Sequence, residues 1–516
     1  DALELYNNIL KKYPKNKRAL LGKLSCKEYA PEKSIDNIIY LFQSGLFENA
    51  EQKLNEIILK YPEDENLYNI AGAIYSRQKK FEIAIENYKK AIALKNDFPE
   101  AYNNLAETYN TLKRFHESVE ICQFLIKDYP NYAEPYNNLG NSLIGLGRFK
   151  EALRYFEGSK HLNNPNKSSV LNNIALANAY LGNFSKTIDC AFEAFRINIK
   201  NEEIINSLSS LILYSNPEDN EKIDEFLKSN YEYFSKKSKI FVLTYRLINY
   251  FCQMKFDLCL NLISEIKKYL ILQKTEKIIT DDKVERFISA YLSFIEKLIQ
   301  YKNINTTHNA INNINEKQLY HVGESHCLTF AHENIRIKNN IFKIKPIITT
   351  GVKAFHLSQQ KDNKFKLFFN HQINKIPQNS KVFISIGEID CRENEGIISH
   401  FLKNKKDLEL IIEKTVNGYV NHVEEIFKNK NIEIYYFSVP APLRNLSAIE
   451  RALFDLRIKV VKLFNENLKK NVLRFNSNYI DTYNFTSTHN GISNDLYMID
   501  NFHLSPKALK IIEKNI

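Results

Sequence analysis

The sequence predicts a chain of two parts: an all-α superhelical solenoid, followed by an α/β/α three-layer domain with a mainly parallel sheet. A 34-residue period of aromatic and small residues runs through about the first 200 positions. From about Leu319, short apolar runs alternate with helical stretches. At 516 residues the chain is also too long for one core. We therefore expect repeats over 1–200, a helical segment over 201–315 and the α/β domain over 316–516.

The repeats are clearest in "LYNIAGAIYSRQKKFEIAIENYKKAIALKND" and the two copies that follow it. Aromatic residues recur with a spacing of 34 at Tyr68, Tyr102 and Tyr136, and again at Phe81, Phe115 and Phe149. A fourth copy, with one inserted residue, runs from Leu171 to Phe184. Small residues recur where paired helices approach closely, at Gly72, Ala106, Gly140 and Ala175, and at Ala84, Ser118, Ala152 and Thr187. This pattern resembles the tetratricopeptide repeat, whose helix pairs stack into a superhelix with a concave side.

Less regular segments flank these copies. The stretch "DNIIYLFQSGLFENAEQKLNEIILKYPED" indicates an earlier repeat, and residues 1–16 resemble the second helix of another. Residues 201–315 keep helical periodicity but lose the motif. They are either degenerate repeats or a helical connector.

Asparagines recur at equivalent positions of the first helices. One column is Asn69, Asn103, Asn137 and Asn172, and a second is Asn104, Asn138 and Asn173. In tetratricopeptide proteins such residues often face the groove, where an amide can donate to and accept from a peptide backbone. The resemblance thus implies a protein or peptide partner. The alternative is that an asparagine-rich chain places asparagine wherever a helix is solvated.

The second part alternates strands and helices. The runs "QLYHVG", "IFKIKPIITT", "KVFISIG", "IEIYYFSVP" and "RFNSNYIDTY" are expected to be strands. The intervening stretches, among them "KFKLFFNHQINKI", are expected to be helices. This alternation predicts a mainly parallel sheet covered by helices. Ligands bind at the carboxyl ends of such strands, so the polar residues there are candidate site residues.

Three such ends are prominent: Gly323-Glu324-Ser325-His326, Gly387-Glu388-Ile389-Asp390-Cys391-Arg392, and Asp500-Asn501-Phe502-His503. The last precedes a helix start with Ser505 as cap and Pro506 in the first turn. A weaker fourth feature is Gly351, after the second strand.

These blocks, in this order, resemble the SGNH (GDSL-like) hydrolase family over about residues 316–516. The resemblance implies that Ser325 is the nucleophile, His503 the general base and Asp500 the carboxylate that orients it. It also implies that the backbone amides of Ser325 and Gly351 are oxyanion donors. These residue types suit acyl transfer, because a serine hydroxyl needs an imidazole to take its proton and the imidazole needs a carboxylate partner.

The chain departs from the family pattern at two positions. Glu324 stands where the family has Asp, and Ile389 stands where an asparagine side chain would face the oxyanion. Loss of one oxyanion donor typically costs about 10²–10³ in turnover. Arg392 is either a substitute donor or a surface partner of Glu393 or Glu395. Asp390 is expected to hold loops together, and His326 to line the pocket or cap the following helix.

Composition excludes several classes. No apolar run approaches the ~20 residues of a membrane span. The formal charge of +11 comes without a basic stripe interleaved with aromatics, so nucleic acid is not an expected partner. Histidines near the site lack metal-ligand spacing, and no cofactor or metal is expected. The seven scattered cysteines favour the cytoplasm. A first residue of Asp1 indicates a fragment, so export is not excluded.

Two functions fit these observations. The first is an SGNH-type serine esterase or O-acyltransferase that acts on acyl groups, most plausibly acetyl, of a carbohydrate or glycosylated partner. The repeats would then hold that partner. The second is a catalytically weak or inactive SGNH domain on the repeat scaffold, serving as a protein- or glycan-binding module. The Ser325, Asp500 and His503 set favours the first, and Ile389 the second.

Overall fold

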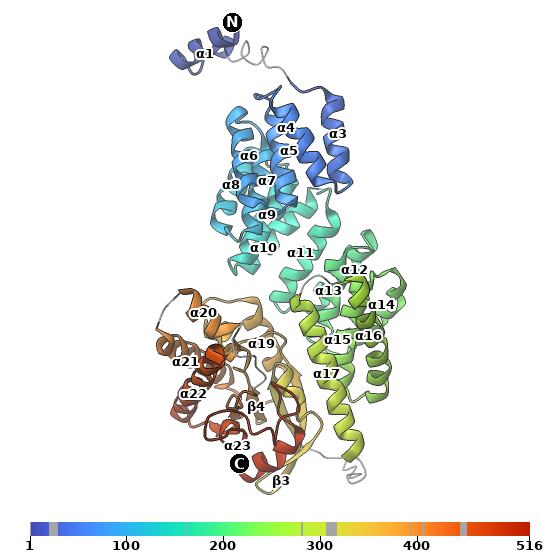
Figure 1. Cartoon of the computed structure of the whole chain (residues 1–516), viewed down its shortest axis with the longest axis vertical. Helices are drawn as coiled ribbons and strands as arrows, with labels where there is room; N and C mark the ends of the chain where they lie inside the picture. Colours follow the sequence, from blue (N-terminus) through green and yellow to red (C-terminus); the bar gives the residue numbers. More distant parts are fainter. Residues whose placement is uncertain are drawn as a thin grey trace. The chain divides into compact units, whose positions relative to one another are not determined.

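A computed structural model describes residues 2–19, 29–162, 164–279, 282–305, 317–393, 395–404, 407–443 and 451–516. These residues form two compact units, Asp1–Ala177 and Asn178–Ile516. Figure 1 shows helices alone in the first unit, and helices together with one sheet in the second.

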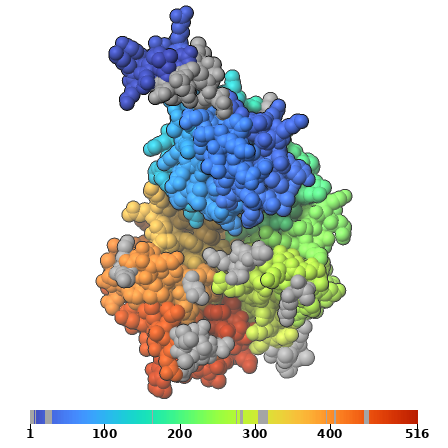
Figure 2. All heavy atoms as spheres, turned by 45° about the horizontal axis from the view of Figure 1, so that its top comes forward, coloured from blue at the N-terminus to red at the C-terminus, as the bar shows by residue number. Residues whose placement is uncertain are grey.

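The first unit is a solenoid of helix pairs. After α1 (Ala2–Lys12), its helices are α3 (Glu32–Gln43), α4 (Phe47–Ile58), α5 (Glu65–Arg77), α6 (Phe81–Leu94), α7 (Pro99–Thr111), α8 (Phe115–Asp128), α9 (Ala133–Gly145) and α10 (Phe149–His161). The next helix, α11 (Lys167–Tyr180), begins in this unit and ends in the second. The predicted repeats are therefore pairs of helices. In Figure 2 the blue side chains of the early repeats form one closely packed mass.

The recurring small residues lie where the helices of a pair touch. A Cβ on Gly72 would lie 2.4 Å from the ring of Tyr88, and a Cβ on Gly140 would lie 2.4 Å from the ring of Phe156. Ala106 and Ala84 are fully buried. The small residues are thus required because an aromatic ring from the second helix fills the space beside the first.

The second unit begins with more helices: α12 (Phe184–Ile197), α13 (Glu202–Leu211), α14 (Pro217–Ser229), α15 (Lys236–Cys252), α16 (Phe256–Glu276) and α17 (Asp282–Asn305). A short 3-10 turn, η1 (Tyr231–Tyr233), joins α14 and α15. Helices α15, α16 and α17 share one apolar core with Cys327, Leu328, Ala331 and Ile348 of the α/β part. Within the segment 201–315, which the sequence left open, α15 to α17 thus pack onto the α/β elements.

The sheet has six strands in the order β2-β3-β1-β4-β5-β6. They are β1 (Lys317–Gly323), β2 (Asn334–Ile337), β3 (Asn340–Ile348), β4 (Lys381–Ser385), β5 (Glu433–Phe437) and β6 (Asn478–Ile480). All pairs are parallel except β2 with β3, so the sheet is mixed. The five predicted strands are present, and the antiparallel edge strand β2 was not predicted.

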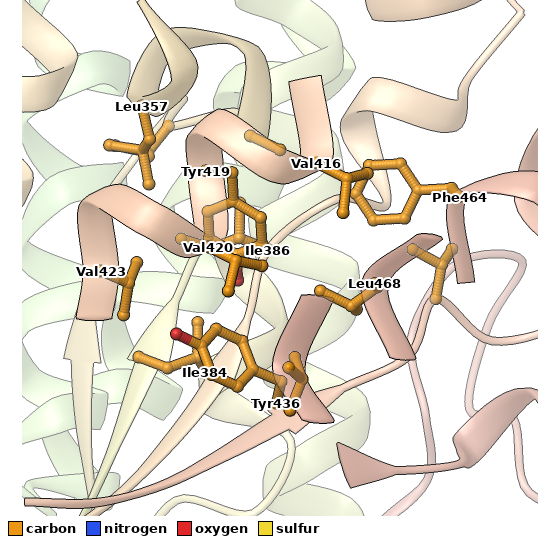
Figure 3. Close-up of a cluster of buried hydrophobic side chains, with 14 of the residues drawn as sticks. Leu357, Ile384, Ile386, Val416, Tyr419, Val420, Val423, Tyr436, Phe464 and Leu468 are labelled. Carbon is orange, nitrogen blue, oxygen red and sulfur yellow. The ribbon is translucent and has the colours of Figure 1, made fainter. Parts of the chain in front are cut away.

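Helices cover both faces of the sheet. They are α18 (Ala354–Ser358), α19 (Lys364–Asn374), α20 (Gly396–Asn404), α21 (Leu408–Phe427), α22 (Arg451–Arg474), α23 (Thr482–Thr486) and α24 (Leu509–Lys514). One face packs under α18 to α22, where Tyr419 and Phe464 meet Ile384 and Tyr436 of the strands (Figure 3). On the other face Leu319, Phe383 and Tyr435 pack with α24. The alternation of inward residues along each strand produces these two cores.

The carboxyl ends of three parallel strands meet at one edge of the sheet. In the register of the sheet, Gly323 of β1 lies opposite Ile348 of β3 and Ser385 of β4. Only glycine fits at the end of β1, because a Cβ on Gly323 would lie 2.5 Å from the Ser385 hydroxyl. The loops that begin with Glu324, Thr349 and Ile386 therefore leave the sheet side by side.

Candidate active site

Ser325, His503 and Asp500 form a hydrogen-bonded chain at this edge. Ser325 begins the 3-10 turn η3 (Ser325–Leu328) directly after β1. Its Oγ lies 2.8 Å from Nε2 of His503, and Nδ1 of His503 lies 2.8 Å from Oδ2 of Asp500. The residues come from segments 178 positions apart. This is the geometry in which a histidine can take a proton from a serine hydroxyl.

Asp500 is held as an anion by its own loop. Oδ1 of Asp500 accepts the backbone N–H groups of Phe502 and His503. Burial raises the pKa of Asp500, but the hydrogen bond and charge of His503, together with these two N–H groups, outweigh burial and lower it. A carboxylate fixed in this way can keep the His503 proton on Nδ1, which leaves Nε2 facing Ser325 as an acceptor.

The backbone N–H of Ser325, a predicted oxyanion donor, is engaged by the preceding side chain. It donates to Oε2 of Glu324 over 2.5 Å, and the Ser325 hydroxyl contacts the same oxygen. Glu324 thus caps η3 instead of leaving the N–H free. In this arrangement the Ser325 donor is not available to an oxyanion.

Gly351 and Asp390 lie in the two adjacent loops. Gly351 has a φ of 70° and lies three residues after the end of β3. Asp390 accepts the backbone N–H groups of Ala354 and Phe355 at 2.8 and 3.0 Å. The carboxyl of Asp390 therefore ties the loop after β4 to the loop that carries Gly351. Ile389 is buried in the turn η4 (Ile389–Cys391), and its side chain offers no hydrogen-bond donor.

Arg392 binds a different carboxylate from the two that the sequence suggested. Its guanidinium pairs with Glu388 at 2.6 Å and lies 4.5 Å from the centre of the Phe502 ring. Arg457 pairs with the other oxygen of Glu388 at 3.2 Å and also faces Phe502. Of the suggested partners, Glu393 pairs with Arg457 and Glu395 with Lys353. Because Phe502 lies between Asp500 and His503, this cluster holds the loop that carries both.

His326 supports the same loop. Its Nε2 lies 2.9 Å from the carbonyl oxygen of Phe502, so this nitrogen carries the proton and donates it. Burial and the charge of the neighbouring His503 lower the pKa of His326 to about 4. His326 is therefore neutral near pH 7, and its ring lies 4.7 Å from that of His503.

Residues far upstream complete the site. The ring of Phe294, in α17, stacks on the His503 imidazole at 3.9 Å and 15°. The hydroxyl of Tyr291, one turn earlier, donates to Oε1 of Glu324 at 2.9 Å. The sequence did not predict either contact, because the apolar spacing of an amphipathic helix does not show which other element its buried face packs against. It also missed Arg457, for which there was a signal: a charged residue at core spacing with Phe454, Val461 and Phe464.

Loss of the Glu388 charge is expected to destabilise the protein. In a Glu388→Gln variant two arginines lose a shared, buried carboxylate, and Arg457 keeps only Glu393. Removing one partner of a buried ion pair costs about 3–5 kcal/mol. We expect about 2–3 kcal/mol here, since the Arg392 side chain is 27% exposed. Urea denaturation at pH 7 measures it, with the exposed Glu413→Gln on α21 as the control.

The difference in free energy of unfolding between the wild type and Glu388→Gln is expected to depend on pH. Burial raises the pKa of Glu388, but Arg392 and the other nearby cations outweigh it and lower the pKa from 4.5 to about 2. The stabilisation is therefore present above pH 4.5 and is lost as the pH falls toward 2. The difference between wild type and Glu388→Gln should shrink across that window. A difference that stays constant on acidification would contradict the ion-pair explanation.

Two features are absent from the described ranges. No group of three or more His, Cys, Asp or Glu residues there is arranged to hold a metal ion. None of the helices in those ranges combines the length and apolarity that a bilayer crossing requires.

The asparagine columns of the first unit bind each other across repeats. Nδ2 of Asn104 donates to Oδ1 of Asn69 at 3.0 Å. The same bond joins Asn138 to Asn103 at 2.8 Å and Asn173 to Asn137 at 3.0 Å. Asn172 is buried, and its side-chain oxygen has no hydrogen-bond partner among the described residues. One bond of each pair thus connects neighbouring repeats. Asn103 and Asn138 are buried, whereas Asn69, Asn104, Asn137 and Asn173 are half-buried and keep hydrogen-bonding capacity for a ligand.

Family models match the first unit in three places. A model described as TPR repeat matches residues 72–112, and two described as tetratricopeptide repeat match residues 99–126 and 136–161. The N-terminal part of the chain contains tetratricopeptide repeats. Repeats of this kind form protein–protein interaction scaffolds, and a protein or peptide partner follows for this chain.

Several solved structures are similar to part of the chain at low sequence identity. MamA from Desulfovibrio magneticus RS-1 is 13% identical, with a TM-score of 0.28 over 32% of this chain and 93% of that chain. MamA AMB-1 is 20% identical, with a TM-score of 0.26 over 32% and 97%. YrrB, described as a TPR protein with an unusual peptide-binding site, is 16% identical, with a TM-score of 0.27 over 40% and 98%. No curated protein matches the chain.

Proposed function

We propose that the chain is a serine ester hydrolase or O-acyltransferase of the SGNH type, in the cytoplasm, with Ser325, His503 and Asp500 as its catalytic residues. The observation that carries this proposal is the pair of 2.8 Å contacts that link the Ser325 hydroxyl to His503 and His503 to Asp500. A strand-end turn without a catalytic role has no need of an imidazole and a carboxylate aligned behind its hydroxyl.

The proposed chemistry follows from these contacts. Oγ of Ser325 attacks the ester carbonyl carbon while its proton passes to Nε2 of His503. The tetrahedral oxyanion then collapses, the bond to the leaving alkoxide breaks, and His503 returns the proton to that oxygen. Water or an acceptor hydroxyl attacks the acyl-serine by the reverse sequence. Asp500 stabilises the imidazolium that forms in each half-reaction.

The substrate class is proposed from the family resemblance. Members often act on acylated glycans, so an acetyl group on a carbohydrate or a glycosylated protein is the proposed substrate. The repeats would hold that partner or a peptide in their groove. Hydrolysis and transfer share the acyl-enzyme and differ in whether water or a hydroxyl resolves it.

A second candidate is a binding module with a weak or inactive SGNH-type domain. Two observations favour it: Glu324 engages the Ser325 N–H, and Ile389 provides no oxyanion donor. Under this proposal the α/β part recognises a protein or glycan without turning it over. Binding would then be indifferent to replacement of Ser325.

Covalent labelling separates the two candidates. A fluorophosphonate should react with the full chain and add one phosphonyl group, detected by intact mass and assigned to Ser325 by peptide mapping. The Ser325→Ala and His503→Gln variants should remain unlabelled at the same concentration. A chain that stays unmodified while folded, or that is labelled equally in Ser325→Ala, would overturn the hydrolase proposal.

A further inference from the structure

One face of α17 lies against the candidate active site. Tyr291, Phe294 and Lys297 follow each other at helical spacing. Phe294 stacks on His503, and the Lys297 ammonium donates to the carbonyl oxygen of Ile499, the residue before Asp500, at 3.3 Å. The helix therefore touches the loop of the proposed base directly.

Tyr291 reaches the other side of the site through Glu324. The Tyr291 hydroxyl donates to Oε1 of Glu324 at 2.9 Å, while Oε2 of the same carboxylate binds the N–H and the hydroxyl of Ser325. Tyr291 and Ser325 are both buried, so water does not replace these bonds freely. The result is a continuous bridge from α17 to the proposed nucleophile.

This bridge occupies the two groups that acyl transfer requires of Ser325. The backbone N–H is needed by the developing oxyanion. The hydroxyl has one proton and two acceptors within reach, Oε2 of Glu324 and Nε2 of His503. A proton donated to Glu324 is not donated to His503. While the Glu324 carboxylate stays in place, it competes with the oxyanion for the Ser325 N–H and with His503 for the Ser325 hydroxyl proton.

We propose that Tyr291 is a positioning residue that holds Glu324 on Ser325, so that α17 sets how often the site is free to react. This inference rests on the proposed hydrolase or acyltransferase function and adds its regulation. A substrate whose binding shifts α17, or displaces Glu324, would release the serine.

Three variants of the full chain test the bridge: Tyr291→Phe, Glu324→Ala and the double variant. We expect Tyr291→Phe to raise kcat for p-nitrophenyl acetate at least about tenfold, because one hydrogen bond to a charged group is lost. Glu324→Ala should raise kcat at least as much. The double variant should match Glu324→Ala, since Tyr291 acts only through Glu324. KM should change little, and the exposed Ser293→Ala on the same helix is the control.

The outcomes distinguish this inference from the function on which it depends. A merely structural role for Tyr291 would lower kcat and the melting temperature together, and would overturn the proposal. So would Ser325-dependent turnover in the wild type that neither single variant increases, although the hydrolase function would then stand. If no variant turns over ester and Ser325 is not labelled by the fluorophosphonate, the proposed function fails, and this inference fails with it.

Discussion

Replacement of Ser325 by alanine is expected to lower kcat for p-nitrophenyl acetate by at least about 10³-fold, because the members of such a triad act as a unit. In the described site, the Ser325 hydroxyl lies at one end of the chain of hydrogen bonds that runs through His503 to Asp500. His503→Gln should cost a similar factor, and the two losses should not add in the double variant.

The measurement needs a control for contaminating esterase and for folding. Ser229→Ala, an exposed serine on α14, should leave turnover unchanged. Circular dichroism should be the same for all variants. Turnover in Ser325→Ala equal to that of the wild type would show that the ester is cleaved elsewhere and would favour the binding module.

Removal of the helices before the sheet is the second change with a large expected effect. A chain of residues 178–516 should fold and keep Ser325-dependent turnover, because it retains the whole second unit. A chain of residues 316–516 loses Tyr291 and Phe294 and exposes Leu328 and Ile348, which pack against α15 to α17. Each such side chain contributes roughly 1.5–3 kcal/mol when buried. That is a large share of a typical net stability of about 5–15 kcal/mol.

We therefore expect the shorter chain to aggregate or to melt well below the longer one, with turnover at background. Size-exclusion chromatography, thermal melting and the ester assay measure this. If residues 316–516 alone were monomeric and fully active, the helical segment would be a connector without a part in the site.

The repeats could be predicted well because their signal is local and periodic. Gly72 and Gly140 recur at one phase of the pattern, and each meets an aromatic ring of its partner helix. Strands β1, β3, β4, β5 and β6 were also predictable, since the apolar runs that contain them are bounded by polar residues and have few alternatives. Strand β2 has only four residues at the edge of the sheet, and its alternating "NIRI" is too short to separate from a loop.

The site was predictable only in part. Ser325 follows a predicted strand, and Asp500 and His503 lie in the loop before the last predicted helix, where the family resemblance expects them. The contacts of Tyr291 and Phe294 depend on how a distant helix packs, and no spacing in the sequence encodes them. Arg392 pairs with the buried Glu388 and not with Glu393 or Glu395. The sequence shows three carboxylates near Arg392 but does not show which of them is buried.

The asparagine pairs have a consequence for the history of the repeat array. At three successive junctions, between α5 and α7, α7 and α9, and α9 and α11, one amide of a repeat pairs with one of the next, and the same two positions serve each time. If the 34 residues 99–132 were duplicated or lost, the newly adjacent repeats would again present one asparagine to the other. Loss of that segment, for example, would bring Asn138 to Asn69. Unequal recombination could therefore lengthen or shorten the array by whole repeats without creating a junction that lacks the asparagine pair.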